Sequence, residues 1–331
     1  MHFTFLLLAP LCAFIHAVFG KAEVKEFEKF IKKYNKVYKS PQEYRYRLSV
    51  FTKNLNTAHQ LQKEERGTAK YGVTKFSDLT DEEFTRNTLT YVDALPSNNV
   101  KQLKVEATPV HESCDWRKAG VISKAKNQST CGSCWAFTAV GNIEAQWGIL
   151  GRPVNLSVQQ VLDCGPCEAG CRGGYVWDAY VTVMKLQGLV NERDYQYVGV
   201  TQKCRSTSSS KTFIYDFIML PKNEHAMANY LRNNGTIAVA INSTLLKDYI
   251  GGVIEQKSCE PNSVNHAVLL VGYHLKDKKQ PHWILKNSWG EDWGENGFFK
   301  LHFGSNMCGV TTWPLSAVVT YPGSTSYTCP P

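Results

Sequence analysis

The chain has 331 residues and 43% of them are hydrophobic, so it can bury a sizeable core but is too short for three ordinary domains. The net charge is +8, and +5 of it falls within residues 21–110. A nucleic-acid-binding protein concentrates positive charge on its functional domain, and no stretch after residue 20 approaches the ~20 apolar residues of a membrane span, so the composition argues against both classes.

The first 20 residues predict a secretory signal peptide. They contain no Asp, Glu, Lys or Arg, and an apolar run extends from Phe3 to Leu11. Of the 11 cysteines only Cys12 lies in this segment, and all the others follow residue 110. A secretory route makes disulfide bonds the default for these ten cysteines, although one reactive thiol would leave an odd number to be paired.

Residues 21–62 predict two helices. Apolar side chains repeat at three- and four-residue spacing from Phe27 to Tyr34, and Ser40-Pro41 provides an N-cap and a first residue for the second helix. Two further segments are expected before the next helix, namely a short strand over residues 71–76 and a cleavable linker over residues 92–112, which is rich in turn-forming residues.

The segment after Asp115 predicts a helical half followed by a strand-rich half. Helices first and strands second predict an α+β fold with two segregated subdomains and a cleft between them. The expected helices are a clearly amphipathic one over 134–150, one over 158–163 that is capped by Ser157, and one over 175–187 that ends at Gly188. The expected strands are 236–241, 266–273, 282–287, 297–303 and 315–320.

A cysteine-rich segment contains the candidate nucleophile. Cys134 opens the predicted 134–150 helix, where the positive end of the helix dipole favours the thiolate. A thiolate nucleophile also needs a base that later protonates the leaving amine, and His266, at the start of a predicted strand, is the candidate. Asn287 can hold the imidazole without adding charge. The amide of Gln128, together with the N–H of Cys134, can stabilise an oxyanion.

These residues lie in motifs that resemble those of papain-like cysteine proteases, and the resemblance covers essentially all of residues 27–320. Within that family the chain is most similar to the cathepsin W and F branch. The resemblance implies a helical part and an antiparallel, β-barrel-like part with a cleft between them, and a thiol endopeptidase made as a self-inhibited zymogen. The matching motifs are Gln128, Cys131-Gly132-Ser133-Cys134-Trp135, Cys171-Arg172-Gly173-Gly174, Asn265-His266-Ala267 and Asn287-Ser288-Trp289-Gly290.

The resemblance also implies how a peptide binds. Gly173 and Gly174 would offer backbone hydrogen bonds to an extended peptide. An apolar pocket would favour a hydrophobic residue two positions before the scissile bond, and the bulk of Trp313 would make this pocket shallow. Trp289, also expected at the substrate-binding surface, would shield the imidazole from water. The pocket residues are expected to be Tyr175, Val176, Val264, Ala267 and Trp313.

The three disulfide bonds of the family fall on Cys131–Cys171, Cys164–Cys204 and Cys259–Cys308. Each closes a long loop, which stabilises the fold by a few kcal/mol. Cys114, Cys167 and Cys329 are left over, and one arrangement joins Cys114 to Cys167 and leaves Cys329 unpaired.

Two motifs before residue 80 resemble the inhibitory prosegment of the cathepsin W and F branch. A secreted protease with a preformed thiolate must be blocked until it reaches its compartment, and acid would weaken the block by protonating Asp78 and other prosegment carboxylates. The expected organisation is a signal peptide (1–20), an inhibitory propeptide (21–110) and a catalytic domain (111–331) with a short tail (321–331). The motif residues are Glu43, Arg47, Phe51, Asn54, Ala58 and Gln62, followed by Gly72, Thr74, Phe76 and Asp78.

Four Asn-x-Ser/Thr sequons are present. We expect N-linked glycans at Asn155, Asn234 and Asn242. Asn127 directly precedes Gln128, and a glycan there would crowd the cleft, so we expect Asn127 to stay unmodified. Ser129 replaces the glycine that the family usually has, which could perturb the oxyanion loop.

Two other functions remain open from the sequence. One is a catalytically weak relative that acts mainly by binding. The other is a thiol oxidoreductase, because Cys131 and Cys134, like Cys164 and Cys167, match the Cys-x-x-Cys pattern, although no βαβ unit surrounds either pair. The expected partners are peptide or protein substrates, the chain's own propeptide and cystatin-type inhibitors. We expect a monomer that needs no cofactor, metal or nucleic acid, in the secretory pathway, chiefly in lysosomes or endosomes, with the endoplasmic reticulum or extracellular space as alternatives.

Overall fold

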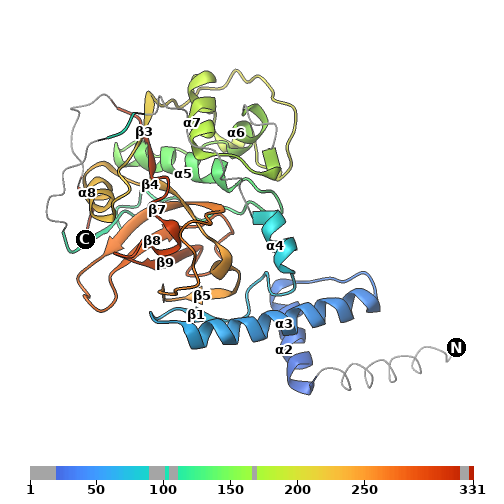
Figure 1. Ribbon diagram of the computed structural model, residues 1–331. Coiled ribbons are helices and arrows are strands. Elements are labelled where there is room, and N and C mark those ends of the chain that lie inside the picture. Colours follow the sequence, from blue (N-terminus) through green and yellow to red (C-terminus); the bar gives the residue numbers. More distant parts are fainter. Residues whose placement is uncertain (1–19, 89–100, 104–110, 166–169, 321–327) are drawn as a thin grey trace.

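The computed structural model describes residues 20–88, 101–103, 111–165, 170–320 and 328–331 (Figure 1). The expected signal peptide, apart from Gly20, and most of the expected linker lie outside these ranges. The described α-helices are α2 (Lys21–Tyr34), α3 (Pro41–Glu64), α4 (Asp81–Thr88), α5 (Cys134–Ile149), α6 (Val158–Cys164), α7 (Val176–Lys185) and α8 (Glu224–Asn234). Short 3-10 helices are η1 (Gly170–Arg172), η2 (Glu192–Asp194), η3 (Thr244–Asp248) and η4 (Met307–Gly309).

The strands of the described chain are short. They are β1 (Lys70–Tyr71), β2 (Ser113–Asp115), β3 (Asp216–Met219), β4 (Ile237–Ile241), β5 (Tyr249–Gly251), β6 (Val253–Ile254), β7 (His266–His274), β8 (His282–Lys286), β9 (Phe298–His302) and β10 (Leu315–Val318). The α+β class predicted from the sequence is therefore confirmed, with helices concentrated in the first half of the catalytic region and strands in the second.

The N-terminal helices form their own small core. Helices α2 and α3 pack together through aromatic side chains, and Phe27 and Phe51 are fully buried. Ser40 caps α3 as predicted, because its Oγ accepts a hydrogen bond from the backbone of Glu43. The strand predicted over residues 71–76 is wrong beyond Tyr71. Thr74 and Ser77 instead hydrogen-bond to each other in a turn. Phe76, within this turn, packs against Trp289 of the catalytic region.

Helix α5 is buried on all sides, so its prediction as a clearly amphipathic helix is wrong. Nearly all its residues are inaccessible to solvent, including the polar Asn142 and Gln146. The reason is its central place, because α6 and α7 pack on one side of α5 while β7, β4 and β10 pack on the other (Figure 1). The buried polar side chains are satisfied by tertiary hydrogen bonds, such as that from Asn142 Nδ2 to the carbonyl of Thr236.

An eight-stranded sheet forms the second half of the fold. Its strand order is β3-β10-β4-β7-β8-β9-β6, and β2 additionally pairs with β7. All pairs are antiparallel except β6 with β9, which run parallel and depart from the all-antiparallel expectation. A side chain at Gly272 of β7 would place Cβ only 2.6 Å from the carbonyl oxygen of Cys114, so glycine permits the close approach of β2.

The N-terminal segment docks on this sheet-rich part. β1 pairs with β5 in a two-stranded antiparallel sheet, and α3 runs along the lower side of the sheet-rich part in Figure 1. Backbone hydrogen bonds extend the contact, since the N–H groups of Thr68 and Ala69 both donate to the carbonyl of Val253. Among the described helices, none is long and apolar enough to span a membrane.

Four disulfide bonds connect described cysteines. Three are the pairs implied by the resemblance, Cys131–Cys171, Cys164–Cys204 and Cys259–Cys308. The fourth joins Cys114 to Cys329 across 215 residues, so the Cys114–Cys167 arrangement is wrong, while Cys167 itself lies outside the described residues. The described side chains include no group of three His, Cys, Asp or Glu arranged to hold a metal ion.

Candidate active site

Among the described cysteines, Cys134 is the one that forms no disulfide bond, and it is fully buried. It is the first residue of α5, so the helix dipole points its positive end at the sulfur, which favours the thiolate. Because Cys131 is bonded to Cys171, the pair Cys131 and Cys134 does not form a redox dithiol.

His266 begins β7, the strand against which α5 packs. His266 is fully buried, and its Nε2 lies 2.8 Å from Oδ1 of Asn287, which also accepts a hydrogen bond from the N–H of Ser288. Because an amide oxygen can only accept, this bond requires Nε2 of His266 to carry the proton. Nδ1 is then the nitrogen that can exchange a proton with a thiol. The indole of Trp289 stacks on the imidazole with ring centroids 4.8 Å apart.

Gln128 is also fully buried and is fixed at several atoms. Its Oε1 accepts a hydrogen bond from Ser288 Oγ at 2.6 Å, and its Nε2 donates to the carbonyl of Cys131 at 2.9 Å. Its backbone N–H donates to the carbonyl of Ser288. The amide orientation is therefore set by the segment that carries Asn287, so the oxyanion candidate and the imidazole-orienting residue form one hydrogen-bonded unit.

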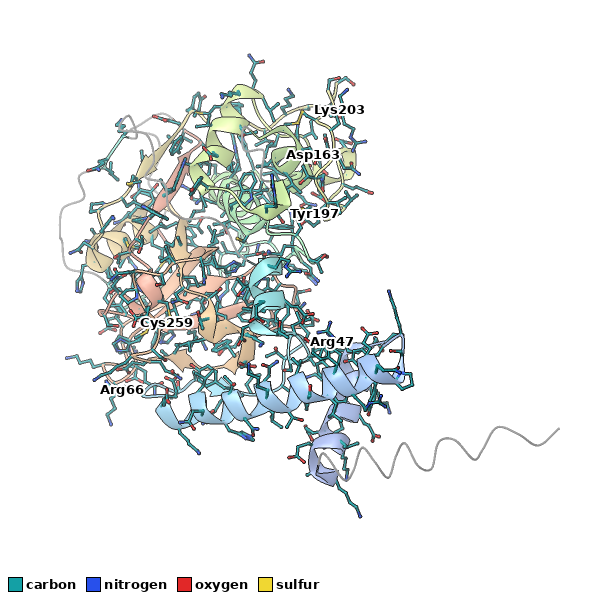
Figure 2. All side chains as sticks on the ribbon, turned by 45° about the vertical axis from the view of Figure 1, so that its right-hand side comes forward. Arg47, Arg66, Asp163, Tyr197, Lys203 and Cys259 are labelled. Atoms are coloured by element: carbon teal, nitrogen blue, oxygen red, sulfur yellow. A yellow bond between two sulfur atoms is a disulfide. The ribbon has the colours of Figure 1, made fainter. Side chains whose placement is uncertain are left out.

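Tyr197 supports the same loop and was not identified from the sequence. Its hydroxyl lies 2.7 Å from Ser133 Oγ and donates to the carbonyl of Gln128 at 2.9 Å. Figure 2 shows Tyr197 on the helical half of the catalytic region. Burial raises the pKa of Tyr197 to about 12, and the nearby charge of Cys134 adds to the shift. No short motif could reveal this contact, because Tyr197 is 69 residues from Gln128 in the chain.

A buried ionic network lies behind Asn287. Lys286 donates to Ser123 Oγ at 2.8 Å, Ser123 donates to Glu144, and Glu144 pairs with Lys126 at 2.8 Å. Burial lowers the pKa of Lys286 to about 8. This network anchors the end of β8, and therefore the start of the Asn287 loop, to helix α5.

The expected substrate pocket exists but is small. A cavity of about 20 Å³, enough for roughly one water molecule, is lined by Tyr175, Val176, Ala267 and Trp313 among others. The expectation for Val264 is wrong, because it does not line this cavity and its Cγ1 lies against Gly309 instead. Gly174, which the sequence suggested as a substrate-binding residue, also lines the cavity, and the lining residues that the sequence did not suggest are Trp177, Ala240 and Leu315.

Gly174 has a packing reason to be glycine. A Cβ at this position would lie 2.6 Å from the indole of Trp135, the residue after the nucleophile. Gly173 has a φ of 127°, a backbone conformation that only glycine adopts readily. Both glycines are buried beside Tyr175, which stacks on Trp177 with ring centroids 4.4 Å apart.

The prosegment covers Trp289 with two aromatic side chains. The rings of Phe76 and Phe84 pack edge-on against the indole of Trp289, with centroids 5.2 and 5.4 Å away. Beside them Lys75 Nζ donates to the carbonyl of Trp289 and pairs with Asp292 at 2.8 Å. The prosegment therefore seals the residue that shields His266.

A second contact is centred on Lys247 of η3. Its Nζ donates to Asn54 Oδ1 and to Asp81 Oδ1, both at 2.8 Å, and its carbonyl accepts from Thr74 Oγ1 at 2.6 Å. Lys247 is buried, so all these prosegment groups recognise one catalytic-domain residue. The adjacent Asp248 is buried as well, which raises its pKa to about 7.

The predicted prosegment motif residues hold the prosegment together. Asp78 accepts from Lys36 Nζ at 2.7 Å and from Tyr38 OH at 3.0 Å. Arg47, labelled on α3 in Figure 2, binds Glu83 through two hydrogen bonds of 2.6 and 2.9 Å. The Arg47 guanidinium holds the pKa of Glu83 below its ordinary value. Other motif side chains bind backbone: Asn54 donates to the carbonyls of Ser77 and Leu79, and Gln62 donates to Ala69 and accepts from Tyr71.

The sequons differ in accessibility. Asn127, Asn155 and Asn234 are exposed. The expected glycan at Asn242 is incompatible with this fold, because Asn242 is only 5% exposed and its Nδ2 donates to the carbonyl of Glu260. The sugar would have to be attached to this same nitrogen.

Two family models match the chain. The model described as the papain family cysteine protease matches residues 110–318, and that of the cathepsin propeptide inhibitor domain matches residues 27–84. Among characterised relatives, cathepsin W of Felis catus is 45% identical and the match covers 93% of this chain and 90% of the relative. Cathepsin F of Mus musculus is 42% identical, over 88% of this chain and 64% of the relative.

Solved structures of precursors also superpose on the chain. A recombinant stem bromelain precursor has a TM-score of 0.81 at 28% identity, covering 90% of this chain and 99% of its own. A digestive procathepsin L2 from the Tenebrio molitor larval midgut has a TM-score of 0.83 at 31% identity, covering 89% and 99%. The likeness therefore includes the N-terminal segment as well as the catalytic region.

Proposed function

Because the chain belongs to the papain family of cysteine proteases and is a thiol endopeptidase made as a zymogen, we propose that Cys134 is its nucleophile, His266 its acid and base, and Asn287 the residue that orients the imidazole. The observation that supports this most strongly is the buried 2.8 Å contact between His266 Nε2 and Asn287 Oδ1, at the start of β7, against which the helix that begins at Cys134 packs. Because Nε2 is bonded to Asn287, we propose that Nδ1 is the nitrogen that exchanges a proton with Cys134.

In the proposed reaction the thiolate of Cys134 attacks the carbonyl carbon of the scissile peptide bond. The N–H of Cys134 and the side-chain amide of Gln128 donate to the oxygen that becomes negative, so Gln128 acts only on the transition state. As the C–N bond breaks, His266 gives its proton to the leaving amine. Water then attacks the thioester, His266 takes one water proton, and the acid product and the thiolate are released.

We infer that the substrate lies extended along Gly173 and Gly174. Both glycines bring the backbone close to the nucleophile without a side chain in the way, which suits hydrogen bonding to a peptide main chain. The small apolar cavity beside Trp313 favours a small aliphatic side chain over a large aromatic one two positions before the scissile bond. Trp289 completes the proposed substrate-binding surface on the side where the prosegment now lies.

We also propose that residues 21–110 are the propeptide, that residues 1–20 direct the chain into the secretory pathway, and that the catalytic domain begins near residue 111 and ends in the tail 321–331. Supporting the assignment of the propeptide, β1 pairs with β5 and the side chains of Thr74 and Gln256 hydrogen-bond across the same boundary. A lysosomal or endosomal destination fits a zymogen that acid activates. Cystatin-type inhibitors are proposed as further partners of a monomer, and the exposed sequons Asn155 and Asn234 as glycan sites.

The test is covalent labelling of the acid-treated precursor by an epoxide-type thiol inhibitor, followed by peptide mass spectrometry. Modification of Cys134 alone is expected, and the new N-terminus should lie between about residues 105 and 114, near the start of β2. A folded His266→Ala variant that cleaves peptides at the parent rate would contradict the assignment of the base, and labelling at Cys164 or Cys167 would favour the oxidoreductase reading.

A further inference from the structure

Ser129, in the loop that follows Gln128, has an unusual backbone conformation. Its φ is 56°, in the left-handed region that glycine adopts without cost and most other residues avoid. The side chain is exposed, and its hydroxyl forms no hydrogen bond to any residue that the structure describes. A serine here therefore costs conformational free energy and provides no visible packing or hydrogen bonding to the fold.

The hydroxyl has a chemical use in the sequon Asn127-Gln128-Ser129. Asn127 is exposed, and its Oδ1 accepts a hydrogen bond from the N–H of Ser129 at 2.9 Å. That bond occupies the oxygen and leaves Nδ2, the atom to which a sugar attaches, without a bond to another described group. Asn242 provides the contrast within the same chain, because its Nδ2 is buried and donates to a backbone carbonyl.

Space is available at Asn127. A cavity of about 660 Å³ separates the prosegment from the catalytic region, and Asn127, Ser129 and Thr130 form one of its walls. The opposite wall combines aromatic rings with polar groups, as carbohydrate-binding surfaces do, and consists of Lys33, Tyr34, Asn35, Lys36, Lys75, Phe76, Leu79 and Phe84. The expectation that crowding keeps Asn127 unmodified therefore has no basis in the zymogen.

We propose that Asn127 carries an N-linked glycan whose first sugars occupy this cavity in the zymogen and, once the prosegment has left, restrict the part of the substrate site beside Trp289. The proposal rests on the proposed secretory route. In the attachment step Nδ2 of Asn127 forms a bond to the anomeric carbon of a polyisoprenyl-diphosphate-linked oligosaccharide. The bond from that carbon to the diphosphate oxygen breaks, the lipid diphosphate leaves, and Nδ2 loses one proton.

The position of the sugar determines its effect on catalysis. Asn127 forms an isolated β-bridge with Trp289, so the glycan extends from beside Trp289. None of the residues that line the Trp313 cavity lines the cavity at Asn127. The glycan should therefore obstruct substrate residues that follow the scissile bond and leave those that precede it unaffected.

The first experiment maps modification without using activity. The full chain with Cys134→Ala is secreted from a eukaryotic host, treated with a peptide amidase that releases N-glycans in ¹⁸O-water, and digested. Asn127 should be converted to ¹⁸O-labelled aspartate and Asn242 should not. An unlabelled Asn127, whether or not the other sequons are labelled, would overturn the proposal, and this outcome is independent of whether the protease reaction is as proposed.

The second experiment tests the effect on substrates in the activated enzyme. Asn127→Gln and Ser129→Gly each remove the sequon. Thr130→Ala changes the same cavity wall but leaves the sequon intact. Both sequon-removing variants should raise kcat/KM roughly tenfold for a peptide that extends beyond the scissile bond, relative to a substrate with only a small fluorescent leaving group there. Thr130→Ala should leave this ratio at the parent value. An unchanged ratio in the two sequon variants would refute the obstruction, even with the glycan present.

Discussion

Replacing Phe84 by alanine should loosen the prosegment from the catalytic region. Phe84 is 5% exposed, and its ring packs edge-on against Phe76 and Trp289, with centroids 5.2 and 5.4 Å away. Truncating a buried phenylalanine costs about 3–5 kcal/mol, and each aromatic pair contributes about 0.5–1.5 kcal/mol beyond its buried area. The Phe84–Phe76 contact lies within the prosegment, so the substitution also destabilises the undocked state, and this part of the loss does not weaken docking. Docking should therefore weaken by about 2–3 kcal/mol, which raises the undocked fraction roughly 30- to 150-fold.

The assay is the rate at which an epoxide-type inhibitor modifies Cys134 in the full-length, uncleaved zymogen at neutral pH. When docking is faster than labelling, this rate is proportional to the undocked fraction, so it should rise by the same factor. Val37→Ala, at an 86% exposed prosegment position, is the matched control and should label at the parent rate. A folded Phe84→Ala zymogen that labels no faster than the parent would refute the reasoning, because the prosegment would not be held at Trp289.

Four further outcomes are expected. Asn287→Ala should lower kcat roughly 10- to 100-fold, the value of a hydrogen bond to a charged imidazole, and a smaller loss in steady-state kinetics would make Asn287 structural. Because Arg47 depresses the pKa of Glu83, the stability from this pair is present above the ordinary pKa and is lost as pH falls through the lower value, so Glu83→Gln should shift the onset of processing to higher pH in a pH series. Trp313→Ala should move selectivity from valine towards phenylalanine, two positions before the scissile bond, by roughly tenfold in kcat/KM. Cys329→Ala should destabilise the domain by about 2–5 kcal/mol, seen as a melting temperature several degrees lower.

Two carboxylates with shifted pKa values, Glu83 of the prosegment and Asp248 of the catalytic region, respond to acid in opposite directions. Glu83 has a lowered pKa, so acid weakens the prosegment through it. Burial raises the pKa of Asp248 to about 7, so protonation relieves a buried charge and acid strengthens docking through this group. Weakening of the block by protonation of prosegment carboxylates stays a prediction, and we expect Asp248, on the surface where the prosegment docks, to act against it.

The sequence predicted those features that depend on local periodicity or on short motifs. The spacing from Phe27 to Tyr34 and the Ser40 cap predicted α2 and the start of α3. Both signals depend only on residues three or four positions apart in the chain. The motifs around Cys134, His266 and Asn287 identified the candidate catalytic residues, since each motif brings its own backbone context. The structure then brings Asn287 within hydrogen-bond distance of His266.

Features set by distant packing could not be predicted. The pairing of Cys114 with Cys329 requires the C-terminal tail to pack beside β2, which lies 215 residues earlier in the chain. Asn242 is buried where its Nδ2 donates to the carbonyl of Glu260, 18 residues later in the chain, and a three-residue sequon carries no information about that contact. Helix α5 is buried on all sides because its polar residues hydrogen-bond to distant residues, as Asn142 does to Thr236. The positions of its polar residues in the sequence therefore do not indicate a solvent-exposed face.

The bond between Cys114 and Cys329 has a topological consequence for a molecule that works among proteases. It joins the first strand of the catalytic region to the last residues of the chain, where Asp115 also hydrogen-bonds to Pro330. Residues 114–329 therefore form a covalently closed circle. A single cut anywhere in that circle, including one made by a second copy of the enzyme, opens it without releasing a fragment. The two parts of the cut chain stay covalently joined until the disulfide is reduced. Cleavage of the backbone and separation of the fragments are therefore two separate events.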